Sequence, residues 1–433
     1  MTEPSFAGLG VAEPLRRALQ AEGYARPTPI QAQAIPLLLA GRDLLGIAQT
    51  GTGKTAAFAL PILQQLSAAR EPAGPRAARA LILAPARELA LQIGESFKSY
   101  GRHLGLRQTV VYGGVGYEKQ IQALARGVDI LVATPGRLLD HLAQGKLRLD
   151  QASILVLDEA DQMLDMGFIL SVRKIISAML GRRQSMLFSA TMPPAVAGLA
   201  GEVLRNPVRV QVSPSATMVD EVDQRVFFVE TPGKRALLAR LLKDPGLGRV
   251  LVFTRTKHGA NRVSEFLGKE GIAAEALHGN KTQGARVRAL ESFRAGRARV
   301  LVATDVASRG IDIADVTHVI NFEMPNVPES YVHRVGRTAR AGAAGVALSF
   351  CDPAEQAYLR DIERLTKRPL TVAGGQPARA AAPPQAPARP QASRKPQAPG
   401  RPQAPSRPQA APAGPSASRR RWRPRRAAAR RAV

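Results

Sequence analysis

The sequence predicts an α/β protein with two successive parallel-sheet domains, followed by a basic, proline-rich tail. Three observations carry this prediction: short apolar runs recur along the chain, each is followed by a segment with helical spacing, and this pattern ends after Arg368. Runs of about four to six apolar residues without alternation are typical of strands buried on both faces of a parallel sheet. A chain of 433 residues is long enough for two domains and an appendage.

Two groups of predicted strands are separated by one break. The first group lies at residues 44–47, 81–84, 128–133, 154–157 and 185–188, and the second at 250–253, 300–303, 319–322 and 346–350. Between them, the segment 206–223 has mixed polarity, two prolines and no helical stripe, which indicates an interdomain linker. We therefore expect a first domain over residues 1–206, a linker over 207–222 and a second domain over 223–368.

The tail, residues 369–433, carries 14 Lys or Arg, no Asp or Glu, and 14 of the chain's 33 prolines. Pro-Gln-Ala triplets repeat in it every six residues from Pro384 to Pro408. Such a segment cannot bury a core, so we expect it to be disordered with a polyproline II bias. Trp422 lies among the arginines of residues 419–426, where an aromatic ring is suited to stacking on an exposed base.

The formal net charge of +27 points to a polyanionic partner. The alternative that the charge serves only solubility remains open at this point, because net charge bears on association rather than on fold. Cys351 is the single cysteine, which excludes an internal disulfide and a cysteine-based zinc cluster. The start of the sequence has no secretory pattern and no apolar run reaches the ~18 residues of a membrane span, so we expect a soluble, cytoplasmic protein without a membrane partner.

A phosphate-binding loop is predicted between the first apolar run and the helical segment that follows it. A strand, a glycine-containing turn and a helix start bring backbone N–H groups and the helix dipole to a phosphate. Lys54 is placed to reach the β- and γ-phosphates and Thr55 to ligate Mg²⁺. The match is imperfect, because Ala48 stands where the general pattern has glycine. The expected nucleotide-binding residues are Ala48, Gln49, Thr50, Gly51, Thr52, Gly53, Lys54 and Thr55.

A pair of carboxylates, Asp158 and Glu159, follows the apolar run 154–157 directly. Asp158 is suited to be the second protein partner of Mg²⁺, and Glu159 to orient and deprotonate an attacking water. An acidic helix N-cap would also place carboxylates after a strand, but it would not explain the phosphate loop about 100 residues upstream.

The second domain has no second phosphate loop and offers instead the cationic segment 333–340. Arg337 and Arg340 are expected to share one helix face and to supply positive charge to a reacting phosphate. A solvated basic helix is the alternative for this segment taken alone.

Together these segments resemble the DEAD-box family of superfamily 2 helicases over roughly residues 5–368. The matching motifs include GYARPTPIQ at 23–31 with Phe6 upstream, PARELA at 85–90, TPGR at 134–137, SAT at 189–191, HGNKTQGAR at 278–286 and ATDVASRGID at 303–312. The resemblance implies two tandem RecA-like domains, with ATP and Mg²⁺ as cofactors. It also implies RNA-stimulated ATP hydrolysis that drives local, non-processive unwinding of short RNA duplexes or remodelling of ribonucleoproteins.

The resemblance also assigns roles to individual residues. Gln31 would read the adenine edge, Tyr24 would pack on the ring, and Asp305, Gly310 and Asp312 would complete the nucleotide interface. Ser189, Thr191, Asp161 and His333 would couple nucleotide state to RNA grip. The RNA backbone would be held, with little sequence specificity, by Arg87, Gly114, Thr134, Arg137, Gln283, Arg286 and Thr304.

Two positions depart from the family pattern. Ala86 replaces the usual Thr, so one hydroxyl donor to RNA is missing. Ala339 replaces the usual Gly, which should matter little if the backbone there is helical. The segment 278–286 and the basic tail most resemble the bacterial RhlE-like branch.

An ATP-gated RNA clamp that serves as an assembly platform remains open as an alternative. A passive RNA chaperone with a decayed ATPase is a third possibility, but the intact Lys54, Glu159, Arg337 and Arg340 argue against it. We expect a monomer that meets ribosome-assembly or RNA-degradation proteins.

Overall fold

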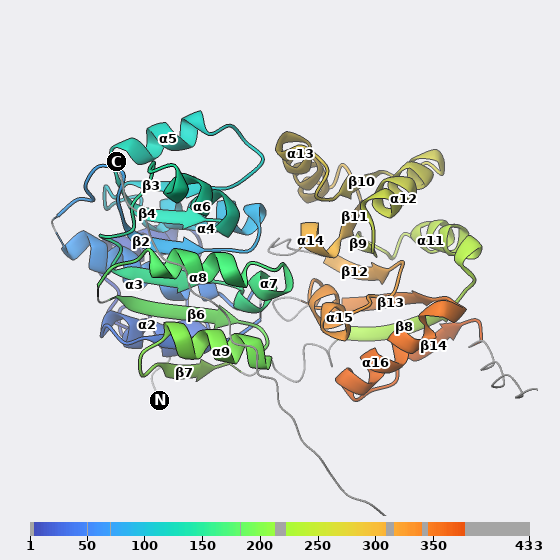
Figure 1. Cartoon of the computed structure of the whole chain (residues 1–433). Helices are drawn as coiled ribbons and strands as arrows, with labels where there is room; N and C mark the ends of the chain where they lie inside the picture. Colours follow the sequence, from blue (N-terminus) through green and yellow to red (C-terminus); the bar gives the residue numbers. More distant parts are fainter. Residues whose placement is uncertain are drawn as a thin grey trace, which may run out of the picture. The chain divides into compact units, whose positions relative to one another are not determined.

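A computed structural model describes residues 4–49, 51–69, 71–181, 183–212, 222–308, 316–339 and 345–376. Within these residues the chain forms two seven-stranded sheets, each flanked by helices on both faces (Figure 1). The strand pairings in both sheets are parallel, as the unalternating apolar runs predicted.

The first sheet has the strand order β3-β4-β2-β5-β6-β1-β7. Its central strands are buried throughout, which explains their apolar sequences. The strands are β1 Leu44–Ile47, β2 Ala78–Leu83, β3 Gln108–Val111, β4 Val128–Ala133, β5 Ile154–Leu157, β6 Gln184–Ser189 and β7 Val208–Gln211.

Nine helices among the described residues belong to this first domain, and they cover the two faces of the sheet. The helices are α1 Glu13–Ala21, α2 Pro29–Leu39, α3 Lys54–Ala68, α4 Arg87–Tyr100, α5 Glu118–Ala125, α6 Pro135–Ala143, α7 Ala160–Asp165, α8 Ile169–Ser177 and α9 Pro194–Val203. Side chains alternate along each strand, so Val156 belongs to the core cluster on one face and its neighbours Leu155 and Leu157 to the cluster on the other.

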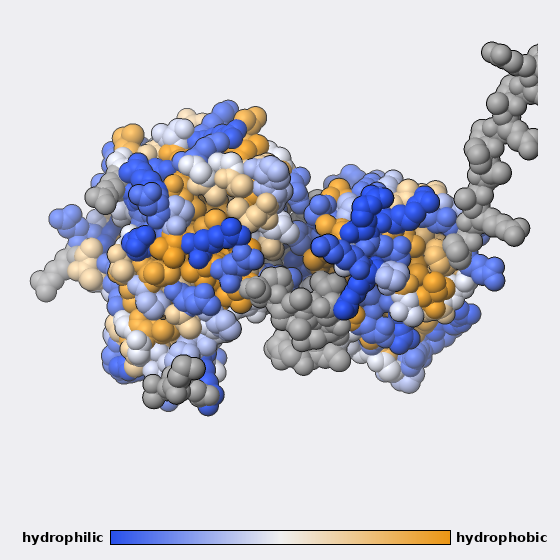
Figure 2. All heavy atoms as spheres, turned by 90° about the horizontal axis from the view of Figure 1, so that it is seen from below, coloured by the Kyte–Doolittle hydropathy of each residue, from blue (hydrophilic) through white to orange (hydrophobic). Residues whose placement is uncertain are grey.

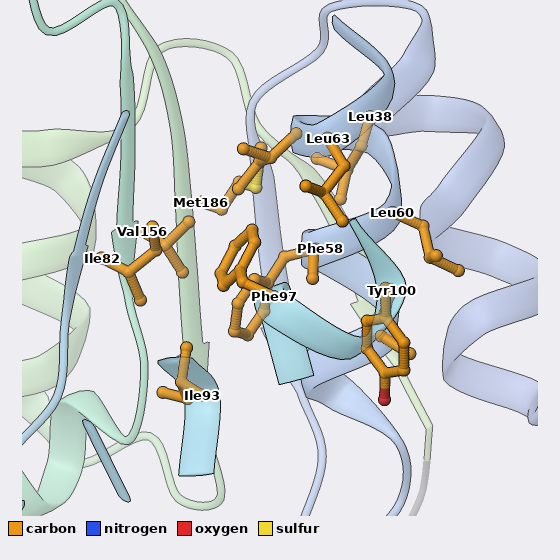
Figure 3. Close-up of a cluster of buried hydrophobic side chains, with 14 of the residues drawn as sticks. Leu38, Phe58, Leu60, Leu63, Ile82, Ile93, Phe97, Tyr100, Val156 and Met186 are labelled. Carbon is orange, nitrogen blue, oxygen red and sulfur yellow. The ribbon is translucent and has the colours of Figure 1, made fainter. Parts of the chain in front are cut away.

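The core between the first sheet and helices α2, α3 and α4 is built around aromatic rings (Figure 3). Phe58 lies with its ring centroid 5.5 Å from that of Phe188 and 6.2 Å from that of Phe97. Each fully buried side chain of this size contributes about 1.5–3 kcal/mol. Tyr100, the last residue of α4, lies at the margin of the cluster, and its hydroxyl is 2.8 Å from that of Tyr24.

The second sheet has the order β10-β11-β9-β12-β13-β8-β14. Its strands are β8 Val222–Phe228, β9 Arg249–Thr254, β10 Ala274–Leu277, β11 Val300–Thr304, β12 Val316–Asn321, β13 Gly345–Cys351 and β14 Thr371–Gly374. Its helices are η1 Thr231–Gly233, α11 Lys234–Leu242, α12 Lys257–Lys269, α13 Gln283–Arg294, α14 Asp305–Ser308, α15 Pro328–Val335, η2 Pro353–Glu355 and α16 Gln356–Thr366.

A buried ionic cluster ties the start of α11 to the end of β13. Lys234 is 1% exposed and contacts the carboxylates of Glu355 and Asp352, the latter at 3.2 Å. Arg255 adds a second cation, 3.2 Å from Glu355. The carboxylates are neutralised within the fold, which a buried charge requires.

Each predicted apolar run lies in an observed strand, apart from Ala84, which follows β2, and Phe322, which follows β12. The runs missed β3, β7, β8, β10 and β14. These strands are partly exposed, and β3, β7, β10 and β14 lie at the sheet edges, so they carry no continuous apolar run.

Two domain boundaries differ from the expected ones. β7 pairs with β1 and therefore extends the first domain into the range 207–222 that we assigned to a linker. β14 pairs with β8, so the second domain continues beyond residue 368 into the start of the expected tail. Residues 213–221 and 377–433, with the rest of the predicted linker and tail, lie outside the described residues.

On the face shown in Figure 2, hydrophobic and hydrophilic residues are interspersed. No helix within the described ranges is long and apolar enough to span a membrane.

Candidate nucleotide and RNA site

The predicted phosphate loop connects β1 to the N-terminus of α3. Gly51 and Gly53 have φ of +87° and +93°, a conformation that favours glycine. A Cβ on Gly53 would also lie 2.5 Å from the Gln31 side-chain nitrogen. Lys54 begins α3 and its Nζ donates to the Ala48 carbonyl at 2.9 Å, while the Thr52 hydroxyl donates to the Gln49 carbonyl at 2.8 Å. Thr50 lies outside the described residues.

Gln31 connects the start of α2 to this loop. Its side chain is fully buried, its Oε1 accepts from the Thr28 N–H at 2.9 Å, and its Nε2 donates to the Gly53 carbonyl at 3.1 Å. Thr28 and Gln31 form a capping box at the N-terminus of α2. The residue predicted to read adenine is therefore held against the loop predicted to hold phosphate.

The carboxylates of Asp158 and Glu159 follow β5 and are each 2% exposed. Burial, opposed by Lys54 and assisted by Glu159, raises the pKa of Asp158 to about 6. Glu159 has φ +54°, a strained value for a residue other than glycine. This strained residue lies in the short connection between β5 and α7, and α7 begins at the next residue.

These groups share one cavity of about 790 Å³. Its lining includes the predicted phosphate, metal and base residues Lys54, Thr55, Asp158 and Glu159, and the predicted base-recognition residues Tyr24 and Gln31. Its volume lies in the range of small-molecule and cofactor sites. The cavity thus joins the predicted phosphate, metal and base groups.

Asp161 is bonded to the SAT motif. Its Oδ2 accepts from the Thr191 N–H and hydroxyl, both at 2.9 Å, and from the Ala190 N–H at 3.2 Å. The Asp161 N–H donates to the Ser189 hydroxyl at 3.3 Å. The contact that the family resemblance implied between the two motifs is present.

Arg87 and Arg137 form a basic group at the carboxyl ends of the strands, with Gly114 against Arg87. Gly114 has φ +81°, and a Cβ there would collide with the Arg87 guanidinium. Burial, together with Arg286 and Arg137, lowers the pKa of Arg87. Arg137 donates to the Val115 carbonyl at 3.0 Å and its guanidinium lies 3.9 Å from the Tyr117 ring centroid.

The predicted RNA residues of the second domain include a pair bonded to Glu88. Arg286 forms an ion pair with the Glu88 carboxylate at 2.8 Å, and Gln283 donates to it at 3.4 Å. Thr134 and Thr304 follow β4 and end β11, and each is 8% exposed. A carboxylate therefore orients two of the groups expected to meet phosphates.

Arg334 is a residue that the sequence analysis did not assign. It is 1% exposed and binds Asp305 through two hydrogen bonds of 2.6 and 2.7 Å. It also donates to Asn321 and to the Glu323 carbonyl. Asp305, expected to serve the nucleotide interface, is thus held by a buried guanidinium. The cationic segment 333–340 was the signal, but no sequence spacing pairs it with Asp305.

The cationic segment is not one helix, contrary to our expectation. α15 ends at Val335, and Arg337, which follows it, donates its Nε to the His333 carbonyl at 3.3 Å. The Thr338 hydroxyl donates to the Val316 carbonyl at 2.6 Å, so the segment after α15 is bonded to the start of β12. Arg337 and His333 line a small cavity with Gln49 and Thr191.

Ala339 has φ +53°, so its backbone is left-handed, and the condition under which we expected the replacement of glycine to matter little is not met. Arg340, Gly310 and Asp312 lie outside the described residues.

The sequence analysis also missed the part of the cavity wall supplied by α4. Gln92, Ser96, Ser99 and Tyr100 line the cavity beside Tyr24. Their spacing follows the helix and forms no recognised motif, so only the placement of α4 beside α3 reveals them.

The chain has two parallel-sheet domains that carry a phosphate loop, a pair of adjacent carboxylates and a group of basic residues. These features define a two-domain RecA-like ATPase of the helicase class. Two family models match the chain: that of the DEAD/DEAH box helicases over residues 28–199, and the helicase conserved C-terminal domain over residues 233–342. The chain belongs to the DEAD-box family of ATP-dependent RNA helicases, and it is an RNA-dependent ATPase.

Curated relatives include the DEAD-box ATP-dependent RNA helicase CshA of Geobacillus kaustophilus, which is 43% identical over 364 residues, covering 84% of this chain and 77% of the relative. CshA of Bacillus subtilis is also 43% identical, over 84% of this chain and 73% of its own length. Among solved structures, S. cerevisiae Dbp5 bound to RNA and ADP BeF3 is 32% identical, covers 86% of this chain and 95% of its own, and has a TM-score of 0.77.

Proposed function

We propose that this helicase hydrolyses ATP in the cavity of the first domain and uses the cycle to open short RNA duplexes locally. The observation that carries the proposal is the convergence of Lys54, Asp158 and Glu159 on one cavity, with Gln31 bonded to the phosphate loop. Bound RNA and a nucleotide analogue in the structure of Dbp5 support the pairing of the two ligands.

Each residue has a distinct task in this mechanism. The N-terminus of α3 and Lys54 bind the phosphates, and Gln31 with Tyr24 selects the base. Glu159 orients the attacking water and takes its proton. Arg337, with Arg340, stabilises the charge that develops on the transferred phosphoryl group.

The donor set of the cavity fits Mg²⁺, because the Thr55 hydroxyl and the Asp158 carboxylate are hard oxygen ligands. When bound, the ion supplies positive charge to the phosphate oxygens. Within the part of the chain that the structure describes, no group of three or more His, Cys, Asp or Glu could hold a metal. Water and ATP therefore provide most of its ligands in our proposal.

Replacing Glu159 by Gln tests the assigned chemistry. Turnover of ATP in the presence of RNA should fall about 10²–10⁴-fold, because the base is lost. Binding of ATP and RNA should persist, since the amide retains the size of the side chain. Glu202→Gln, on the exposed face of α9 and paired with Arg173, is the control and should keep full turnover. If RNA fails to stimulate ATP hydrolysis by the unmodified protein, the proposed cycle is wrong.

The RNA clamp is the second candidate, and the left-handed Glu159 and the Asp161 contacts serve it equally well. Strand displacement from a short tailed duplex separates the two. Unwinding by the wild type but not by Glu159→Gln supports the motor. A duplex that survives with wild-type protein and ATP, while RNA stays bound, supports the clamp.

The finer expectations belong to the same proposal. We infer a cytoplasmic bacterial monomer of the RhlE-like branch that acts beside ribosome-assembly or RNA-degradation proteins. The support is the basic tail and the 278–286 motif in the sequence. Crosslinking and sequencing of bound RNA would identify the substrates.

A further inference from the structure

A polar pocket of about 270 Å³ lies at the amino-terminal edge of the first sheet. Its walls come from residues that precede β1 and β7 and from residues at the start of β6, and these three strands are neighbours in the sheet. The phosphate loop and the carboxylates Asp158 and Glu159 follow their strands and so lie at the opposite, carboxyl-terminal edge. The pocket is therefore separate from the nucleotide site.

Three arginines line this pocket: Arg42, Arg183 and Arg205. One carboxylate, Asp43, lies among them, but both its oxygens are already used. Its Oδ1 accepts from the Ser185 N–H at 2.9 Å and its Oδ2 from the Arg205 N–H at 2.7 Å. Positive charge is thus in excess in the pocket.

Arg183 is the member of the group that most needs an anion. Burial, followed by the charge of Arg205, lowers its pKa, and Asp43 only partly opposes this. Its Nε is buried and, among the residues that the structure describes, has no hydrogen-bond partner. A buried donor without a partner is unfavourable, and a bound oxyanion would accept its hydrogen bond.

The backbone carbonyl oxygens near the pocket, which would repel an anion, already accept hydrogen bonds from the protein. The carbonyl groups of Leu38 and Arg42, near the end of α2, accept from the Gln184 side chain at 3.0 and 2.8 Å. The Asp43 carbonyl accepts from the Val208 N–H at 2.9 Å. The pocket therefore presents donors, and its walls are fixed by bonds between β1, β6 and β7.

We propose that this arginine pocket, formed by Arg42, Arg183 and Arg205 around Asp43, binds a phosphate group. Arginine suits this ligand because its planar donors match phosphate oxygens in pairs. The group is either a phosphodiester of an RNA strand that extends beyond the main site or a free phosphate. This inference goes beyond the proposed function and does not depend on it.

The test uses the full-length double variant Arg42→Gln with Arg205→Gln. Both side chains are exposed, so the fold should survive. The matched control is Arg17→Gln with Arg126→Gln, which removes two exposed arginines from the same domain outside the pocket. Turnover at saturating RNA should stay unchanged in both, so failure of this inference is distinguishable from failure of the proposed function.

Two measurements distinguish the sources of phosphate. In the first, single-stranded RNA binding is followed against salt, and each lost phosphate contact should lower the log–log slope by about 0.7. In the second, inorganic phosphate is added at constant ionic strength and the melting temperature is recorded. Phosphate that binds in the phosphate loop shifts the melting temperature of both variants equally, so this contribution cancels in their comparison.

A smaller slope in the pocket variant alone assigns the pocket to RNA, and a smaller thermal shift with phosphate alone assigns it to the free ion. Equal behaviour of the pocket and control variants in both measurements overturns the proposal.

Discussion

Ala339 and Glu159 are the two residues whose backbones carry strain next to predicted chemistry. Both have positive φ, and neither is glycine. For Glu159 the strained turn brings a carboxylate into the cavity wall, so the backbone strain accompanies a proposed catalytic role. Ala339 is 2% exposed and lies in the core beside α15 and α16, and its methyl group has no catalytic role in our proposal.

Replacing Ala339 by Gly should therefore stabilise the protein. The left-handed conformation costs an L-residue about 1–2 kcal/mol and glycine almost nothing, while the loss of a small buried methyl offsets part of the gain. We expect a net gain of about 0.5–1 kcal/mol in urea unfolding. The control is Ala239→Gly in the middle of α11, which should lose about 1 kcal/mol. A destabilised Ala339→Gly variant would contradict the assigned strain.

At the scale of the element, Ala86 is the N-cap of α4. Its φ of −123° and ψ of 150° suit a capping residue, but alanine offers no oxygen to the free N–H groups of the first turn. The departure that we related to RNA grip thus has a second consequence, for the helix itself.

Replacing Ala86 by Thr should add the missing cap. We expect a gain of about 1 kcal/mol in the free energy of unfolding, together with tighter RNA binding if the hydroxyl also meets a phosphate. Ala86→Val is the control, because it has a similar shape without the hydroxyl. Equal stability of the Thr and Val variants would argue against the cap.

The buried ionic cluster around Lys234 gives a second prediction at the scale of the element, which concerns stability. Lys234→Met leaves the buried Glu355 and Asp352 with less positive charge, so unfolding should become easier by about 3–5 kcal/mol. The double variant Lys234→Met with Glu355→Gln should recover part of that loss. Urea unfolding measures both, and an equal or larger loss in the double variant would show that charge pairing is not the cause.

At the scale of the molecule, the tail is the part of the chain whose role can be separated by deletion. Its 14 basic residues all follow residue 376, whereas β14 and the buried Leu370 belong to the second domain. A deletion must therefore start at Pro377, not at Pro369.

Removal of residues 377–433 should leave turnover at saturating RNA nearly unchanged and raise the RNA concentration needed for half-maximal rate. The log–log dependence of RNA affinity on salt should become shallower, because phosphate contacts are lost. Binding titrations at several salt concentrations measure this. An unchanged slope would mean that the tail does not bind phosphates.

The sequence predicted the central strands well, because they follow from local patterns, whereas the roles assigned to the nucleotide residues stay predictions. Buried strands need apolar runs, and the phosphate loop needs glycines next to Lys54. It failed where the outcome depends on contacts distant in sequence: the edge strands β7 and β14, the Arg334–Asp305 pair, the end of α15 at Val335, and the arrangement of Arg42, Arg183 and Arg205. None of these has a local signature.

The two sheets have the same strand order when β1 to β7 are matched in turn with β8 to β14. The shared order makes Lys234, the first residue of α11, the structural counterpart of Lys54, the first residue of α3. Gly233 lacks the left-handed turn of Gly53, and Glu355 and Asp352 lie beside Lys234. In the second domain, the lysine at the position of Lys54 is thus paired with carboxylates of the chain itself, where Lys54 is expected to meet phosphates.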